Sequence, residues 1–242
     1  TLIRTLMNLY QKDGGSVTVD GCPMDTMERE AKDRIGFVLD DFLFEEKLSI
    51  ASNGKLFGST YSHYDHGLFL KFCERFELDP KQKTGRLSKG QRTRFQLAFA
   101  LSHQAKLFIM DEPASGLDPL FRKDLTGCMQ ELVEDGTRSI LFSTHLTADL
   151  DQIGDYIALI DEGRFYFCSD MESLRERYRL LEGSREAVEA LQGPQILAVV
   201  HEDYGSTALA EYPGPELTGR LASRAPTLNE LLYYLQKGGC IR

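Results

Sequence analysis

The sequence has 242 residues, of which 42% are hydrophobic and 27% are charged, the composition of an ordinary globular protein. Its formal net charge of −9 argues against nucleic acid as the main partner, because a nucleic-acid-binding surface is usually basic. No apolar stretch approaches the roughly 20 residues that span a bilayer, so we expect any link to a membrane to come from another chain.

The first predicted element is a helix over residues 2–10, where apolar residues recur at roughly helical spacing. A glycine pair at residues 14–15 ends this pattern, and alternating valines then predict a short strand. A second strand is predicted over residues 35–39, and the acids Asp40 and Asp41 follow it directly. Two acids in this position can have a role in binding, or they can simply end the strand.

Residues 42–86 have an irregular, mostly helical pattern that includes an amphipathic helix over residues 69–76. His63, Asp65 and His66 precede that helix and raise the alternative of a metal site. No further ligand lies at a sensible spacing, so we favour a polar, aromatic surface of a helical subdomain.

The densest chemical signal lies near the centre of the chain. Ser88 can cap a helix whose first turn contains Gly90, which leaves main-chain N–H groups and the positive dipole end open to an anion such as phosphate. The apolar run over residues 107–110 predicts a strand buried in a parallel sheet. Asp111 and Glu112 then lie at the carboxyl end of that strand, where ligands bind in open α/β sheets. One acid can hold Mg²⁺ while its neighbour orients or deprotonates a water molecule.

The tight loop SGLD follows these acids, and Pro119 starts a helix with apolar residues from Leu120 to Leu132 along one side. A buried strand is predicted over residues 139–143, and His145 comes just after it. A lone histidine at a strand end is usually structural. This one lies at a carboxyl edge, as the two acids do, and its residue type readily donates a proton or a hydrogen bond near neutral pH.

Five further features are predicted in the rest of the chain: a hairpin at the sheet edge over residues 156–167, a charged helix over 170–181, a strand over 196–200, a loop-rich segment over 205–219, and a last helix after a capping box at 227–230. We interpret residues 171–242 as a small α+β appendage. The sequence does not indicate what this appendage binds.

In this order and spacing, LSKGQ, the apolar strand ending in Asp111-Glu112, and SGLD resemble the ATP-binding subunit of ABC transporters. In that family LSGGQ is the signature motif, an apolar run plus DE is Walker B, and SGLD is the D-loop. The resemblance covers residues 1–170 and implies an α/β fold of the P-loop NTPase kind, a mostly parallel sheet flanked by helices. A helical subdomain would be inserted at about residues 42–105. Asp40 stands where most of the family has a glutamine, which narrows the resemblance to bacterial exporter subunits.

The resemblance also implies the chemistry of the site, with ATP and Mg²⁺ as cofactors. Asp111 and Asp40 would hold Mg²⁺. Glu112 would polarise the attacking water, and His145 would steady the transferred phosphoryl group. Asp118 would link two sites across a dimer. The signature residues that would reach a nucleotide on a second subunit are Ser88, Lys89, Gly90 and Gln91, of which Lys89 replaces the family's first glycine.

Thr1 matches the last threonine of the family's phosphate loop, which ends in GK[ST]T, and an unrelated helix start is the alternative. The glycines and the lysine of that loop are absent from this sequence. We therefore expect a chain that is truncated before or within the Walker A phosphate loop, and a fragment that is inactive by itself.

The resemblance implies an ATPase subunit that powers an ABC transporter, an exporter, at the cytoplasmic face of the cell membrane. Its partners would be transmembrane permease subunits and a second ATP-binding subunit, and no nucleic acid. Phe42, Leu43 and Phe44 are candidates for the permease contact, with a role in the core as the alternative. Two other interpretations stay open: a catalytically inactive or regulatory ABC-type module, and an ABC ATPase that acts outside transport.

Overall fold

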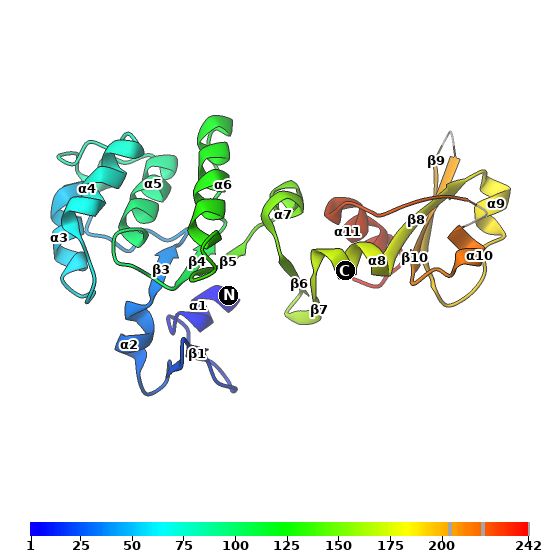
Figure 1. The fold of residues 1–242 in the computed structure, drawn as a ribbon, viewed down its shortest axis with the longest axis horizontal. Coiled ribbons are helices and arrows are strands. Elements are labelled where there is room, and N and C mark those ends of the chain that lie inside the picture. The colour runs from blue at the N-terminus through cyan, green and yellow to red at the C-terminus, as the bar shows by residue number, and fades with distance from the viewer. Residues whose placement is uncertain (203–204, 219–220, 242) are drawn as a thin grey trace. The chain divides into compact units, whose positions relative to one another are not determined.

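The structure is a computed structural model that describes residues 1–202, 205–218 and 221–241. The chain divides into two compact units, residues 1–145 and residues 146–242 (Figure 1). Each unit has its own sheets and its own hydrophobic core. The predicted boundary between an ATPase domain and an appendage, near residue 170, stays a prediction.

The described residues of the first unit form a parallel sheet of three strands in the order β3 (Ile35–Val38), β4 (Leu107–Asp111) and β5 (Ser139–Ser143). Val38 pairs with Met110, and Asp111 pairs with Ser143, so the strands run in register. β4 is the central strand, with β3 on one side and β5 on the other. This position buries most of its apolar side chains. The carboxyl ends of all three strands therefore lie at one edge of the sheet, as the sequence predicts.

Three helices contact these strands: α1 (Leu2–Leu6) contacts β4, α5 (Lys89–Ala100) contacts β3, and α6 (Pro119–Val133) contacts β5. One core cluster joins α1 to the sheet, through Ile3 and Met7 on the helix and Ile35 and Ile109 on the strands. The same cluster reaches the short elements β1 (Thr18–Val19), β2 (Cys22–Pro23) and α2 (Glu28–Asp33). A parallel sheet covered by helices is the predicted architecture, and it is confirmed.

The segment between β3 and β4 is mainly helical, as predicted, and it contains α3 (Ile50–Gly58), α4 (His66–Arg75), the 3₁₀ helix η1 (Thr84–Arg86) and α5 (Figure 1). Its centre is aromatic: the ring centroid of Phe44 lies 4.6 Å from that of Phe95 and 5.2 Å from that of Phe99. These edge-on contacts make Phe44 a core residue. Its neighbour Leu43 is 45% exposed and Phe42 is half-buried, so both remain candidates for contact with a partner.

His66, the first residue of α4, is explained by local contacts. The hydroxyl of Tyr64 lies 2.9 Å from Nδ1 of His66, and the His66 ring stacks on Phe69 with centroids 5.8 Å apart. His63 is exposed. His66 therefore belongs to the aromatic surface of the helical subdomain.

The second unit begins with α7 (Thr147–Ile153), the hairpin of β6 (Tyr156–Asp161) and β7 (Arg164–Asp170), and α8 (Met171–Arg177). An antiparallel sheet follows, in the order β11 (Ala222–Arg224), β8 (Tyr178–Gly183), β10 (Gly205–Glu211) and β9 (Ile196–Glu202). The remaining helices are α9 (Arg185–Glu189), α10 (Pro215–Thr218) and α11 (Leu228–Lys237). α11 packs on β9 and begins at the predicted capping box of Thr227 and Glu230.

Two predictions for the second unit are wrong. The loop-rich segment predicted over residues 205–219 contains β10, a central strand whose Ala208, Leu209 and Ala210 are fully buried. The small residues Ala208 and Ala210 make the apolar alternation of this strand weak, and a strand prediction depends on that alternation. The charged helix predicted over residues 170–181 ends at Arg177, because the chain continues directly into β8.

Three details of the prediction also differ. The sequence predicts a buried β5, but this strand lies at one end of the three-stranded order, and none of its residues is fully buried. Leu120 is 80% exposed, because the buried face of α6 begins at Phe121. The β6–β7 hairpin forms a two-stranded sheet of its own within the described residues, rather than the edge of the main sheet. Among those residues, no helix is both long and apolar enough to cross a membrane.

Candidate active site

The ends of β4 and β5 are tied together by side-chain and main-chain hydrogen bonds. The hydroxyl of Ser143 donates to Oδ1 of Asp111 over 2.6 Å. The backbone N–H of Glu112 donates to the carbonyl oxygen of Ser143 at 3.1 Å and lies 3.2 Å from the Ser143 hydroxyl oxygen. The two predicted acids are therefore held against the neighbouring strand rather than projecting freely into solvent.

Glu112 has an uncommon backbone conformation, with φ at +50°. A non-glycine residue in this left-handed region costs about 1–3 kcal/mol, so the surrounding bonds must hold it there. Its side chain turns to the end of β5, where Nδ1 of His145 donates to Oε2 of Glu112 at 2.8 Å. A carboxylate can only accept, so Nδ1 carries the proton and Nε2 is left to face a ligand. The structure thus joins two of the predicted site residues.

The two partners differ in how far their side chains are exposed. The Glu112 side chain is 31% exposed, whereas that of His145 is 67% exposed. The glutamate is partly shielded, and the histidine is open to an incoming ligand. A contact of this kind fixes the direction of the carboxylate.

Asp40 lies after β3 at the same edge of the sheet and pairs with Lys89, whose Nζ is 2.8 Å from Oδ1 of Asp40. The two side chains are 54% and 57% exposed, so the ion pair contributes at most about 1 kcal/mol. The adjacent Asp41 is engaged by Arg4 at the start of the chain, with 2.7 Å between Oδ2 and Nη2. The hydrogen bond from Arg4 to the Tyr10 hydroxyl, followed by the charge of Asp41, raises the pKa of the Arg4 guanidinium.

The residue before Asp40 is fixed by a side chain that sequence reasoning missed. Gln96, on α5, is only 2% exposed. Its Oε1 accepts the N–H of Leu39 at 3.1 Å, and its Nε2 donates to the carbonyl of Leu39 at 2.8 Å. The sequence does contain a signal for this role, because Gln96 stands between the apolar residues Phe95 and Leu97. A glutamine in such a position is expected to be buried, and a buried amide needs hydrogen-bond partners.

The helix that carries the signature motif starts as predicted. Ser88 is the N-cap of α5, its hydroxyl accepts the N–H of Gln91 at 3.3 Å, and Oε1 of Gln91 accepts the N–H of Ser88 at 3.0 Å. Ser88 and Lys89 are exposed, and Gly90 is half-buried. A Cβ atom at Gly90 would lie 3.6 Å from a methyl of Leu117, so this helix start contacts the predicted D-loop.

Asp118 has a structural explanation within this chain. Its Oδ1 accepts the N–H of Phe121 at 2.9 Å as the N-cap of α6, and its Oδ2 accepts from Nη2 of Arg94 at 3.1 Å. The bond from the Phe121 N–H, more than the charge of Arg94, holds the pKa of Asp118 below its ordinary value. Thr1 is exposed at the start of α1, and its hydroxyl makes no capping bond to that helix. The predicted roles of both residues toward nucleotide stay predictions.

The residues at this edge fit a magnesium–nucleotide ligand by their donor atoms. Asp111 keeps one oxygen free of Ser143, and carboxylate oxygens are hard ligands of the kind Mg²⁺ prefers. Within the described parts of the chain, no cluster of three or more His, Cys, Asp or Glu residues could hold a metal ion. Mg²⁺ in phosphate sites usually takes one or two carboxylates and completes its shell with phosphate and water. Asp111 suits that role directly, whereas Asp40 would first have to release Lys89.

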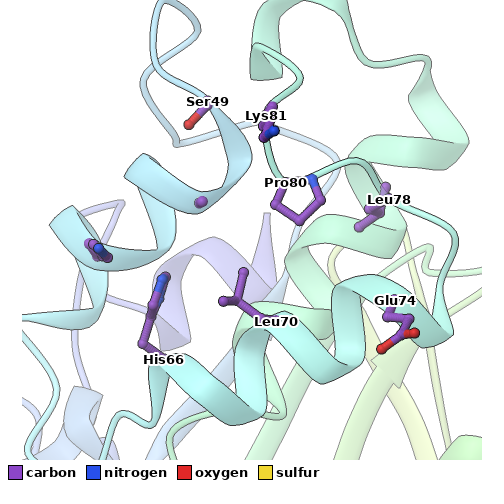
Figure 2. Close-up of a pocket in the computed structure, with 9 residues that line it drawn as sticks. Ser49, His66, Leu70, Glu74, Leu78, Pro80 and Lys81 are labelled. Atoms are coloured by element: carbon purple, nitrogen blue, oxygen red, sulfur yellow. The ribbon is translucent and has the colours of Figure 1, made fainter.

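A separate pocket of about 620 Å³ lies in the helical subdomain between α3 and α4 (Figure 2). It is lined by Lys55, His66, Leu70, Glu74 and Pro80, among others. None of the predicted site residues lines it. The chemistry of the candidate site therefore lies at the sheet edge rather than in this pocket.

Comparison with known proteins gives a family match and several named relatives. Residues 1–115 match the family model described as ABC transporter. The chain is 32% identical over 165 residues to an uncharacterized ABC transporter ATP-binding protein, YdbJ of Bacillus subtilis. The aligned region covers 67% of this chain and 54% of the relative. It is also 32% identical over 172 residues to Nod factor export ATP-binding protein I of Burkholderia lata, covering 68% of this chain and 55% of the relative.

A third relative, daunorubicin resistance ATP-binding protein DrrA2 of Streptomyces coeruleorubidus, is 27% identical and matches 99% of this chain and 76% of its own length. Among solved structures, the dimeric post-hydrolysis state of the ATP-binding cassette MJ0796 bound to ADP and Pi has a TM-score of 0.62 at 21% identity. The match covers 70% of this chain and 79% of that one. The structure of an ATP-binding subunit of an ABC transporter has a TM-score of 0.66 at 20% identity, with 72% and 74% covered.

The fold is that of an ATP-binding cassette. The family match and the named relatives identify an ABC nucleotide-binding domain in this chain, and the predicted resemblance and fold class are confirmed. The chain spans about half the length of the first two relatives.

Proposed function

We propose that this chain is part of an ATP-hydrolysing subunit that powers an ABC transporter. The observation that carries the proposal is the array at the ends of β4 and β5, in which Asp111, Glu112 and His145 are joined through hydrogen bonds. A buried strand with only a structural role does not require three such side chains to be joined at its end. The names of relatives that export Nod factor or confer daunorubicin resistance support an exporter.

Each residue of the array has a distinct role in the proposed reaction. Glu112 orients and polarises the attacking water with the carboxylate oxygen that His145 does not contact. His145 holds that carboxylate through Nδ1, and its Nε2 donates to the terminal phosphate when both ring nitrogens are protonated. Asp111 would supply a carboxylate oxygen to Mg²⁺, which when bound would neutralise charge on the phosphates. Phosphoryl transfer depends mainly on such positioning and charge neutralisation, with little covalent help from protein groups.

The signature helix would act on the nucleotide of a second subunit. The start of α5 combines the capped turn at Ser88 with the small residue Gly90, which permits close approach of a phosphate. Lys89 would leave Asp40 and turn to the γ-phosphate, and the small energy of that exposed pair makes the exchange easy. Gln91 and Asp118 would contribute to the same interface. The dimeric state of the related cassette MJ0796 supports an arrangement in two copies.

The remaining parts of the proposal concern place and partners. The subunit would sit at the cytoplasmic face of the cell membrane and reach it through transmembrane permease subunits. Leu43 and the half-buried Phe42 are the proposed permease contacts. Residues 1–170 would form the ATPase domain, and residues 171–242 an appendage to it.

The substitution Glu112→Gln tests the proposal in the natural protein purified with its membrane partner. We expect ATP binding and subunit closure to persist, while turnover falls by about 10²–10⁴-fold, the usual loss for a positioned base. Glu134→Gln, at an exposed glutamate at the end of α6, is the matched control and should leave turnover unchanged. Full ATPase activity in Glu112→Gln would refute the assignment of Glu112.

A further inference from the structure

We propose that Ser143 is a positioning residue that leaves the Asp111 carboxylate one free oxygen for the metal and fixes the backbone of Glu112. The consequence for hydrolysis rests on the function proposed above. The geometric part does not, because it concerns only hydrogen bonds within the first unit.

The hydroxyl of Ser143 serves both acids at once. Its proton is committed to Oδ1 of Asp111, 2.6 Å away, in a bond strengthened by the charge of the carboxylate. Its oxygen still has lone pairs, and the N–H of Glu112 lies 3.2 Å from it. That N–H also reaches the carbonyl oxygen of the same serine at 3.1 Å. One residue therefore contacts the Asp111 side chain and the Glu112 main chain together.

The bond to Oδ1 limits how Asp111 can bind a cation. With one oxygen engaged, the carboxylate offers the other and binds through a single atom. Mg²⁺ has a small, strict octahedral shell that accepts this geometry, whereas the larger Ca²⁺ commonly takes both oxygens of a carboxylate. Loss of the hydroxyl would free the carboxylate to rotate and to bind through two oxygens, which would weaken the preference for Mg²⁺.

The contact with the Glu112 amide acts on the second acid. Glu112 is held at a positive φ, and the direction of its side chain toward His145 follows from that backbone conformation. The Ser143 carbonyl alone leaves one acceptor for the amide. The hydroxyl adds a second, so its removal should loosen the turn that aims Glu112 at the water.

The geometric part is tested on the 242-residue chain by amide hydrogen exchange at Glu112. Ser143→Ala removes the hydroxyl, and Ser143→Thr retains it. Ser139→Ala, at the exposed serine that begins β5, is the control. We expect exchange at Glu112 to rise roughly three- to tenfold in Ser143→Ala, the range for one lost hydrogen bond, and to stay at the wild-type rate in the other two. Unchanged exchange in Ser143→Ala overturns the proposal.

If Ser143→Ala does not fold, Ser143→Cys takes its place, because a thiol is similar in size and a much weaker donor. Near-ultraviolet circular dichroism of each variant reports whether the fold is kept. A faster exchange in the cysteine variant supports the proposal, and wild-type exchange counts against it.

The consequence for catalysis is tested in the natural protein with its membrane partner. Ser143→Ala should lower kcat or raise the Mg²⁺ concentration for half-maximal activity by about 10–100-fold, as for other groups that orient metal ligands. KM for ATP should change little, and Ser143→Thr should restore both values. A purely structural serine would lower thermal stability without changing the dependence on Mg²⁺, which would overturn the proposal. A wild-type protein without ATPase activity would instead refute the proposed function, and the exchange experiment would still decide the role of Ser143.

Discussion

The amide of Gln96 offers the sharpest test of how this fold positions its candidate site. Gln96→Met removes both polar atoms while keeping the length and the helix preference of the side chain. In the wild type those atoms pair with the N–H and the carbonyl of Leu39, a residue that is only 5% exposed. The substitution leaves both backbone groups buried without these partners.

The expected loss of stability follows from the two backbone groups of Leu39 that lose their partners. Each buried backbone group left without a partner costs about 1–3 kcal/mol, and some relaxation of the loop is expected. We therefore expect the free energy of local opening around Leu39 to fall by about 2–4 kcal/mol. The change should spread to Asp40, which follows Leu39 directly.

Native-state hydrogen exchange in increasing urea measures this quantity residue by residue. The amide of Leu39 should lose protection in Gln96→Met, together with neighbouring amides of β3. Gln130→Met, at an exposed glutamine of α6, is the matched control and should change stability by less than about 0.5 kcal/mol. Wild-type protection of Leu39 in Gln96→Met would show that the carboxamide does not hold the end of β3.

Three further predictions concern charge and ligand. Lys89→Met and Asp40→Asn should each change the free energy of unfolding by less than about 1 kcal/mol, with weak coupling in a double-mutant cycle, because their pair is exposed; strong coupling would contradict this. The hydrogen bond from Arg224 lowers the pKa of Glu230 to about 2, so the stability that this carboxylate contributes should be present above its ordinary pKa near 4.5 and be lost as the pH falls toward 2. Carbon-detected NMR titration should find that low pKa in the wild type and a higher one in Arg224→Met, and equal values would contradict the assignment. Because the 242-residue sequence contains no GxxxxGK[ST] segment, calorimetry on this chain should find ATP binding weaker than micromolar, and a micromolar affinity would refute that expectation.

The predictable part of the site depends on patterns that are short in sequence. The apolar run of a strand buried on both faces predicts that Asp111 and Glu112 lie at its carboxyl end. Parallel strands bring their carboxyl ends to one edge of the sheet. The capping box of Ser88 and Gln91 needs residues only three positions apart. Such features follow from local sequence, and for that reason the strand ends and the helix start were predicted correctly.

The parts that were missed depend on residues far apart in the chain. Gln96 bonds to Leu39 across 57 positions, and Ser143 bonds to Asp111 across 32. No spacing rule relates such pairs when a single sequence is read alone. β10 was missed for a different reason, because its buried alanines carry little of the bulk by which strands are usually recognised.

The position of β5 has a practical consequence for handling the protein. In the part of the chain that the structure describes, this strand is bonded to β4 on one side only, and its Leu141 is 42% exposed. A row of unpaired main-chain groups beside an apolar side chain is a template on which a further strand can add. Solutions of the isolated chain should therefore self-associate as concentration rises, and dilute conditions will favour single molecules.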